Sequence, residues 1–292
     1  MAKGTQIAQK RYLEEPRLEK KGKSITTHCW AKRLTPIAVE VTIYVFLILL
    51  LSAGTYWRNK TWNSELELWT DCVKKSPNKE RPHNNLGNVF DQLEKYQEAI
   101  VQLTEALRIN PYSAEALSNL GNVFDHLGKS QEAIAQFTEA LRISPNFVEA
   151  HFNLGNIYDR LGKSQEAVVQ YTEALRISPN FAEAHYNLGN VFDRLGKSQE
   201  AIAQLTEALR INPNYMEAHY NLGNVFVHLG KYQEAIGQYT EALRINPNIM
   251  EPHYNLGIAY YMMGNRSRAL KEYEILKTMN PGWANALYER IK

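Results

Sequence analysis

Two hydrophobic patterns divide the chain. A continuous apolar run extends from Ile37 to Trp57, with Glu40 as its one charged residue. From Glu80 onward, apolar residues instead recur three or four positions apart with polar residues between them, a spacing typical of amphipathic helices. A run that is apolar all round predicts a helix surrounded by lipid or protein, whereas the second pattern predicts helices that bury one face. We therefore expect an all-α protein with one long apolar helix followed by a packed helical region.

The second pattern repeats every 34 residues. In the unit 182–215, Gly196 is expected to end a first helix because glycine adopts the left-handed conformation without a Cβ clash. Ser198 is expected to cap a second helix, and Pro213 to end it because proline lacks an N–H. A single helical pair cannot bury its apolar face alone, so the pairs are predicted to stack. The period is marked by the pairs Leu86-Gly87, Leu120-Gly121, Leu154-Gly155, Leu188-Gly189, Leu222-Gly223 and Leu256-Gly257.

The unit resembles the tetratricopeptide repeat. The family signature is complete in the fifth unit, as Leu222, Gly223, Phe226, Ala235, Tyr239, Ala242 and Pro247. The resemblance implies a right-handed superhelical solenoid of six repeats over 80–281. It also implies a degenerate half-repeat at 58–79 and a C-terminal capping helix at 282–292. Small residues such as Gly189 and Ala201 are expected where the two helices of a pair cross.

The apolar run predicts a transmembrane helix over 36–57, because about 20 apolar residues cross a bilayer core. The preceding residues 1–35 form a basic tail with nine Lys or Arg and three Glu. Since cytoplasmic flanks carry the excess of positive charge, we expect the N-terminus in the cytoplasm and the repeats on the outer side. Two alternatives stay open: a buried helix of a soluble protein, and a leader cleaved near Ser52-Ala53-Gly54 that releases a soluble or secreted scaffold.

Charge and motifs argue against several other functions. Residues 58–292 carry 24 basic and 27 acidic side chains, which gives no nucleic-acid footprint. The triplets Gly128-Lys129-Ser130, Gly162-Lys163-Ser164 and Gly196-Lys197-Ser198 lack the upstream glycine and strand of a phosphate-binding loop, so no nucleotide is expected. No serine, histidine and acid arrangement typical of hydrolases is visible, and we expect neither an enzyme nor a cofactor.

Histidine stands where the family usually has tryptophan, at His83, His151, His185, His219 and His253. The spacing lacks the close pairs of His ligands that zinc sites use. These side chains are therefore predicted to pack with one satisfied hydrogen bond rather than to bind a metal.

Two sets of asparagines recur on the first helices. In tetratricopeptide folds these helices line a concave groove, so the resemblance places the amides in ladders along it. The amides contact either a bound peptide backbone or an adjacent helix; both interpretations stay open for the first set, and ligand contact is favoured for the second. The first set, which resembles the ladder in the repeat arm of O-linked N-acetylglucosamine transferase, is Asn85, Asn119, Asn153, Asn187, Asn221 and Asn255. The second set is Asn88, Asn122, Asn156, Asn190 and Asn224, and Ile258 ends it.

Further groove candidates lie beside the second set. Tyr186 and Tyr220 precede it by four residues, and Asp159, Arg160, Asp193 and Arg194 follow it. The positions that hold Lys and Arg in the chaperone-tail clamp of some family members hold Tyr and Asn here, so that class of partner is not expected.

Together these features predict a membrane-anchored scaffold. Its groove would bind a protein or an extended peptide segment, and residues 36–57 would contact the lipid bilayer. The junction at 55–88 is also similar to that of glycosyltransferase-like proteins with tetratricopeptide tails, such as the cadherin O-mannosyltransferases. That similarity implies an alternative, an accessory or truncated relative of such an enzyme.

Overall fold

The computed structural model describes residues 27–62 and 64–292, and every regular element in them is an α-helix. The chain divides after Asn63 into two units. The part of the predicted basic tail that covers residues 1–26 lies outside the described residues.

Helix α1 (Thr27–Thr61) extends beyond the predicted segment 36–57 at both ends. Within it, Val39–Tyr56 is the one stretch of the described chain that is long and apolar enough to cross a membrane. A signal sequence passes the same test. The large apolar side chains of this stretch are all exposed, so residues 39–56, whose side chains the structure describes, make none of the buried contacts of a soluble core helix.

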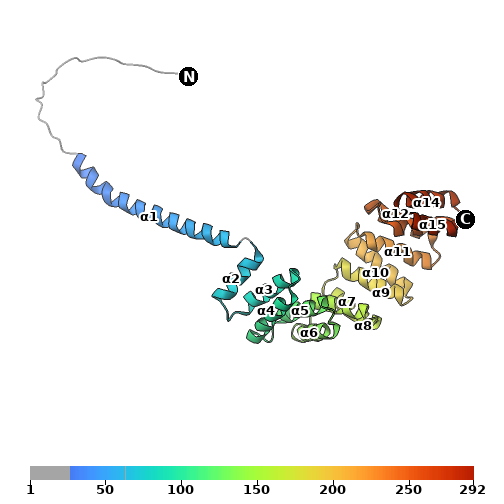
Figure 1. The fold of residues 1–292 in the computed structure, drawn as a ribbon, viewed down its shortest axis with the longest axis horizontal. Helices are drawn as coiled ribbons and strands as arrows, with labels where there is room; N and C mark the ends of the chain where they lie inside the picture. The colour runs from blue at the N-terminus through green and yellow to red at the C-terminus, as the bar shows by residue number, and fades with distance from the viewer. Residues whose placement is uncertain (1–26, 63) are drawn as a thin grey trace, which may run out of the picture. The chain divides into compact units, whose positions relative to one another are not determined.

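The second unit begins with α2 (Glu65–Lys75), whose N-terminus is capped by Ser64 accepting a hydrogen bond from the Glu67 N–H at 3.2 Å. Six helical pairs follow, stacked one after another in Figure 1. The last helix, α15 (Pro281–Ile291), starts one residue before the predicted cap, with proline in its first turn. The six pairs are α3 (Glu80–Gln92) with α4 (Tyr96–Ile109), α5 (Ala114–His126) with α6 (Ser130–Ile143), α7 (Val148–Arg160) with α8 (Ser164–Ile177), α9 (Ala182–Arg194) with α10 (Ser198–Ile211), α11 (Met216–His228) with α12 (Tyr232–Ile245), and α13 (Met250–Met262) with α14 (Arg266–Met279).

The turn inside each pair explains one correct and one wrong prediction. Gly196 follows α9 with φ of +72°, as expected of a glycine that ends a helix. Ser198, however, is the first residue of α10 and not its cap. Lys197 holds the cap position because its N–H already closes the turn onto the Phe192 carbonyl at 2.9 Å, and its own carbonyl accepts from Ala201.

The two helices of a pair cross at a glycine. A Cβ placed on Gly189 would lie 2.8 Å from Cγ and 3.3 Å from the backbone nitrogen of Leu205. Both Leu205 and Ala201 are fully buried. The close approach agrees with the prediction, although the residue nearest to Gly189 is Leu205 and not Ala201.

The buried cores span the boundaries between repeats. One cluster joins Ala201, Leu205 and Ala208 of α10 to Leu222 and Val225 of α11. The equivalent cluster joins α8 to α9 in the preceding repeat. At the C-terminal end, Leu287 and Ile291 of α15 complete a cluster with α14. Each repeat therefore shares a buried core with its neighbours, which adds to the contacts inside its own pair.

The recurring histidines connect the two helices of every pair except the second, where Leu117 occupies the position. His185 places Nδ1 2.7 Å from Gln204 Oε1 and Nε2 3.0 Å from the Pro179 carbonyl. His83, His151 and His219 repeat both contacts with their own glutamine and proline. The side chains thus have two partners rather than the predicted one. Among the described residues, no group of three or more His, Cys, Asp or Glu side chains is arranged to hold a metal.

In the last repeat, the hydrogen bonds of the recurring histidine depend on pH. His253 contacts the Glu272 carboxylate at 2.7 Å and the Pro247 carbonyl at 3.1 Å, and both partners accept hydrogen bonds only. Burial lowers the pKa of His253, but the hydrogen bonds to Glu272 and Pro247 and the charge of Glu272 outweigh it, so the pKa is raised above 6.5. The imidazolium form is therefore favoured in the folded protein.

We expect the melting temperature to fall as pH rises through the raised pKa of His253. A raised folded-state pKa contributes stability that is fully present below the unfolded pKa of about 6.5 and is lost above the folded pKa. The matched control is Glu272→Gln, because a glutamine bonds Nδ1 of the equivalent histidine in four other repeats, at His83, His151, His185 and His219. Thermal melts across this pH range should show a steeper decline for the wild type; parallel curves for the two proteins would contradict the assignment.

Candidate functional site

The two asparagine sets bond to each other across the repeat boundaries from α5 onward. The Nδ2 of Asn187 donates to Oδ1 of Asn156 at 2.9 Å, and that of Asn221 donates to Oδ1 of Asn190 at 2.8 Å. Asn153 with Asn122 and Asn255 with Asn224 form the same bond at 2.8 and 2.9 Å. The amides therefore form a continuous ladder over α5, α7, α9, α11 and α13, and they contact an adjacent helix in both sets.

The direction of these bonds decides which amide atoms remain for a ligand. In the second set the carbonyl oxygen is used, and Asn156 and Asn224 accept a further bond at 2.7 Å from the hydroxyls of Tyr171 and Tyr239. In the first set the amide nitrogen is used, and Asn221 also donates to the Tyr186 hydroxyl at 3.0 Å. We call each pair of asparagines bonded across a boundary a rung. In each rung, the asparagine of the second set keeps an unused NH₂ donor, and its partner of the first set, in the next repeat, keeps an unused carbonyl acceptor.

These remaining amide atoms are open to solvent. The ladder asparagines are only partly buried. Among the described residues, no buried side-chain nitrogen or oxygen lacks a hydrogen-bond partner. The unused donor and acceptor of each rung are therefore accessible to an incoming molecule.

Tyr171 and Tyr239 were not predicted as part of the site, although Tyr239 was identified as a residue of the repeat signature. Burial raises the pKa of both hydroxyls above the ordinary value for tyrosine, so they stay protonated and hold the carbonyls of Asn156 and Asn224. The available signal was tyrosine at the position filled by Phe137 and Leu205 in other repeats. Such a change from Phe or Leu to Tyr inside a core indicates a buried partner for the hydroxyl.

The ladder starts differently in the first repeat. Asn119 donates to Oδ1 of Asn84 at 2.9 Å, and Asn84 donates to Glu115 at 2.9 Å. Asn84 occupies the position that holds Phe152 in a later repeat, and its amide accepts the bond that Asn88 would otherwise receive. Asn88 is exposed and, within the described chain, is not joined to the ladder.

The charged candidates form a second ladder beside the amides. Arg160 pairs with Asp125, and Arg194 pairs with Asp159, each across one repeat boundary. Two histidines take the place of arginine at the equivalent positions: Nδ1 of His126 lies 2.9 Å from Oδ1 of Asp91, and Nδ1 of His228 lies 3.3 Å from Oδ1 of Asp193. The carboxylates of Asp125 and Asp159 are therefore each balanced by an arginine, whereas Asp91 and Asp193 are hydrogen-bonded to a histidine.

A polar hollow of about 180 Å³ lies between the fourth and fifth repeats. It is lined by Asn190, Asp193, Arg194, Asn221 and Asn224, all of them predicted from the sequence. Tyr186 and Tyr220 do not line it. Their hydroxyls instead accept bonds from Asn221 and Asn255 at 3.0 and 3.2 Å, which buttresses the ladder.

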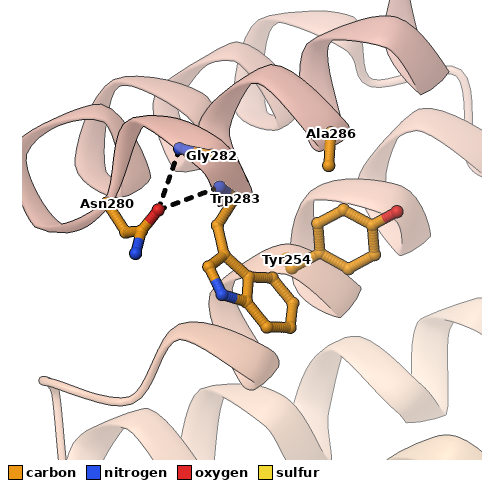
Figure 2. A pocket seen from close by; sticks show the side chains of 5 residues that line it. All are labelled: Tyr254, Asn280, Gly282, Trp283 and Ala286. Carbon is orange, nitrogen blue, oxygen red and sulfur yellow. Dashed lines mark hydrogen bonds between the residues drawn. The ribbon is translucent and has the colours of Figure 1, made fainter.

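Helices α7, α9 and α11, which carry ladder asparagines, also carry aromatic residues, four positions before the second set. Phe152 pairs with Phe181 at a centroid distance of 4.6 Å, and Tyr186 pairs with Tyr215 at 4.8 Å. At the C-terminal end the partner of Tyr254 is Trp283 of α15, at 5.4 Å and nearly edge-on. Figure 2 shows these two rings side by side, with Ala286 directed at the tyrosine. They line a second pocket, of about 490 Å³, that the sequence reasoning did not predict.

Comparisons with known proteins identify the family of the repeats. The family model described as TPR repeat matches residues 87–128, 126–162, 155–196, 194–230 and 223–264, and a second model, described as Tetratricopeptide repeat, matches 253–282. No curated protein matches the chain.

Several solved structures are similar. The MamA protein is 27% identical with a TM-score of 0.55, over 59% of this chain and 94% of that one. YrrB, described as a TPR protein with an unusual peptide-binding site, is 25% identical with a TM-score of 0.58, over 64% and 97%. PilF of Pseudomonas aeruginosa, at 21% identity and a TM-score of 0.64 over 73% and 97% of the two chains, shares the fold.

Proposed function

Because the chain belongs to the tetratricopeptide repeat family and is a protein-interaction scaffold of that family, we propose that its amide ladder binds an extended segment of a partner protein. The segment would lie along the groove formed by α5, α7, α9, α11 and α13. The residues that contact it would be the second asparagine set from Asn122 to Asn224, with Asn153, Asn187 and Asn221 beside them.

The observation that carries this proposal is the pairing of one free donor with one free acceptor at each rung. A peptide group has one N–H and one C=O, so an extended backbone can bond both atoms at successive rungs whatever its side chains are. The paired charges beside the ladder are consistent with a ligand that is read mainly through its uncharged backbone. The likeness to YrrB, whose description names a peptide-binding site, supports the same class of ligand.

Selection from a library of random linear peptides tests the proposal. The full chain in lipid nanodiscs is the target, and empty nanodiscs remove peptides that bind lipid. We expect selected peptides to bind saturably and to compete with one another for one groove. Recovery of no peptide that prefers the chain over empty nanodiscs would overturn the proposal.

We further propose that α1 anchors this scaffold in a membrane, with the N-terminus cytoplasmic and the repeats outside. The support is the exposed apolar stretch Val39–Tyr56 and the basic excess of residues 1–35. The similarity of the junction to glycosyltransferase-like proteins stays a prediction.

Labelling of a single cysteine checks the anchor and its orientation. With Cys29 and Cys72 replaced by serine, a cysteine at the exposed position Ser267 should react with a membrane-impermeant maleimide in intact cells. Reaction only after permeabilisation would reverse the orientation. Release of the chain by alkaline carbonate would contradict the span itself.

A further inference from the structure

The groove changes its chemistry at its C-terminal end. On three successive first helices, an aromatic residue, an asparagine and a basic residue follow one another four positions apart, which places them on one helix face. These triplets are Phe152, Asn156 and Arg160 on α7, Tyr186, Asn190 and Arg194 on α9, and Tyr220, Asn224 and His228 on α11. On α13 the same positions hold Tyr254, Ile258 and Met262.

The charged ladder ends at the same place. Val227 occupies the position of Asp193 one repeat later. Met262, the residue of the next repeat at the position of Arg194 and His228, therefore has no carboxylate opposite it. The side chain of Met262 is 52% exposed, and that of Tyr261 beside it is 39% exposed. The stripe formed by Val227, Ile258, Tyr261 and Met262 therefore carries no charge, in contrast to the groove before it.

The aromatic pocket shares helix α13 with this stripe. Tyr254 lies one helical turn before Ile258 on α13, and both pack with Trp283 against the same core cluster. The Asn280 side chain fixes the start of α15 by accepting hydrogen bonds from the backbone nitrogens of Gly282 at 2.8 Å and Trp283 at 3.3 Å (Figure 2). The indole is thereby held beside an open volume of about 490 Å³, which is large enough for a side chain to enter.

We propose that this end of the groove, where the uncharged residues Ile258 and Met262 follow the pocket lined by Tyr254 and Trp283, is a subsite for one aromatic or branched aliphatic side chain of the bound segment. The inference rests on the proposed function, and it names what the partner must contain beyond an extended backbone. The last rung of the amide ladder joins Asn255 to Asn224, and Ile258 occupies on α13 the position that Asn224 occupies on α11. A segment that continues past this rung along the same line of positions therefore reaches the apolar stripe. A charged side chain is disfavoured there because it would lose water without gaining a partner.

A variant that copies the chain's own polar groove provides the matched control. Val227→Asp with Ile258→Asn and Met262→Arg recreates the residues found at Asp193, Asn224 and Arg194. The new carboxylate and guanidinium would form the ion pair seen between Asp159 and Arg194. The variant is therefore expected to fold, which circular dichroism and the melting temperature verify.

Library selection is run on the full-length wild type and on this variant, both in nanodiscs. Peptides selected on the wild type should share an aromatic or branched aliphatic residue at one end. Replacing that residue by serine should weaken binding to the wild type about tenfold and should change binding to the variant by much less.

The outcomes separate this inference from the proposed function. Peptides that bind both proteins with no apolar preference overturn the subsite and leave the groove proposal intact. Failure to select any peptide on either protein overturns the groove proposal and the subsite with it. Concentration-dependent dimers of the wild type that the variant does not form would also overturn the subsite, because a second copy would then cover the stripe.

Discussion

Gly189→Leu is expected to lower the free energy of unfolding of the repeat region by about 1–3 kcal/mol, the usual cost of overpacking a tight contact. The new side chain would start 2.8 Å from Leu205 Cγ, and the backbone nitrogen of Leu205 lies 3.3 Å away. Leu205 is fully buried, so neither group can move aside without separating α9 from α10. Chemical denaturation followed by circular dichroism measures the loss.

The chain offers a control for the same substitution. Gly237 lies within α12, is exposed, and has nothing within 4 Å of a Cβ placed on it. Gly237→Leu should leave stability unchanged or raise it by up to about 1 kcal/mol, because leucine favours a helix interior more than glycine does. Equal destabilisation by both substitutions would contradict the crossing geometry.

The damage at Gly189 is expected to spread beyond its own pair. Leu205 also belongs to the core cluster shared with Leu222 and Val225 of α11. In a solenoid whose repeats are stabilised by their neighbours, weakening one boundary loosens the adjoining units. Hydrogen exchange should therefore show faster exchange in α11 as well as in α9 and α10; a change confined to α9 and α10 would mean that the boundary cluster contributes little.

Replacing Asn122, Asn156, Asn190 and Asn224 together by aspartate should weaken peptide binding at least tenfold without unfolding the protein. Aspartate keeps an oxygen to accept the bonds from Asn153, Asn187, Asn221 and Asn255, but it has no NH₂ to offer a backbone carbonyl. Each lost hydrogen bond costs roughly 0.5–1.5 kcal/mol, and 1.4 kcal/mol is one decade in affinity. Fluorescence anisotropy with an uncharged library-selected peptide gives the change.

The first asparagine set supplies the opposite control. In Asn187→Asp and Asn221→Asp the lost NH₂ is the group that donates to Asn156 and Asn190, so two oxygens would face each other across the boundary. These variants should melt at lower temperature than the wild type. If the four-site variant melts early instead and its folded fraction binds the peptide with wild-type affinity, the amides are purely structural and the groove proposal is wrong.

The fold was largely predictable because it depends on residues whose role is local. Gly196 ends α9 through its own backbone conformation, and the 34-residue period of Leu-Gly pairs places the helix crossings. The candidate site was predictable only as a set of positions. Whether Asn156 uses its oxygen or its nitrogen depends on Asn187 in the next repeat and on Tyr171 in the core, and no local pattern contains that three-way geometry. The exclusion of Asn88 from the ladder was equally unpredictable, because Asn119, its expected partner, donates to Asn84 instead.

Because the buried clusters between repeats all join the second helix of one repeat to the first helix of the next, a repeat could be lost or duplicated as one genetic module. Loss of residues 182–215 would bring α8 against α11, where Leu222 and Val225 would replace Leu188 and Val191 in the cluster around Tyr171. Asn156 would then accept a hydrogen bond from Asn221 in place of Asn187. Asp159 would pair with His228, as Asp193 already does. Unequal recombination within this region would thus shorten or lengthen the groove by whole rungs while its apolar end stays attached to α13 and α15. Under the proposed function, the length of the bound segment would then evolve separately from the side chain that the subsite at the end selects.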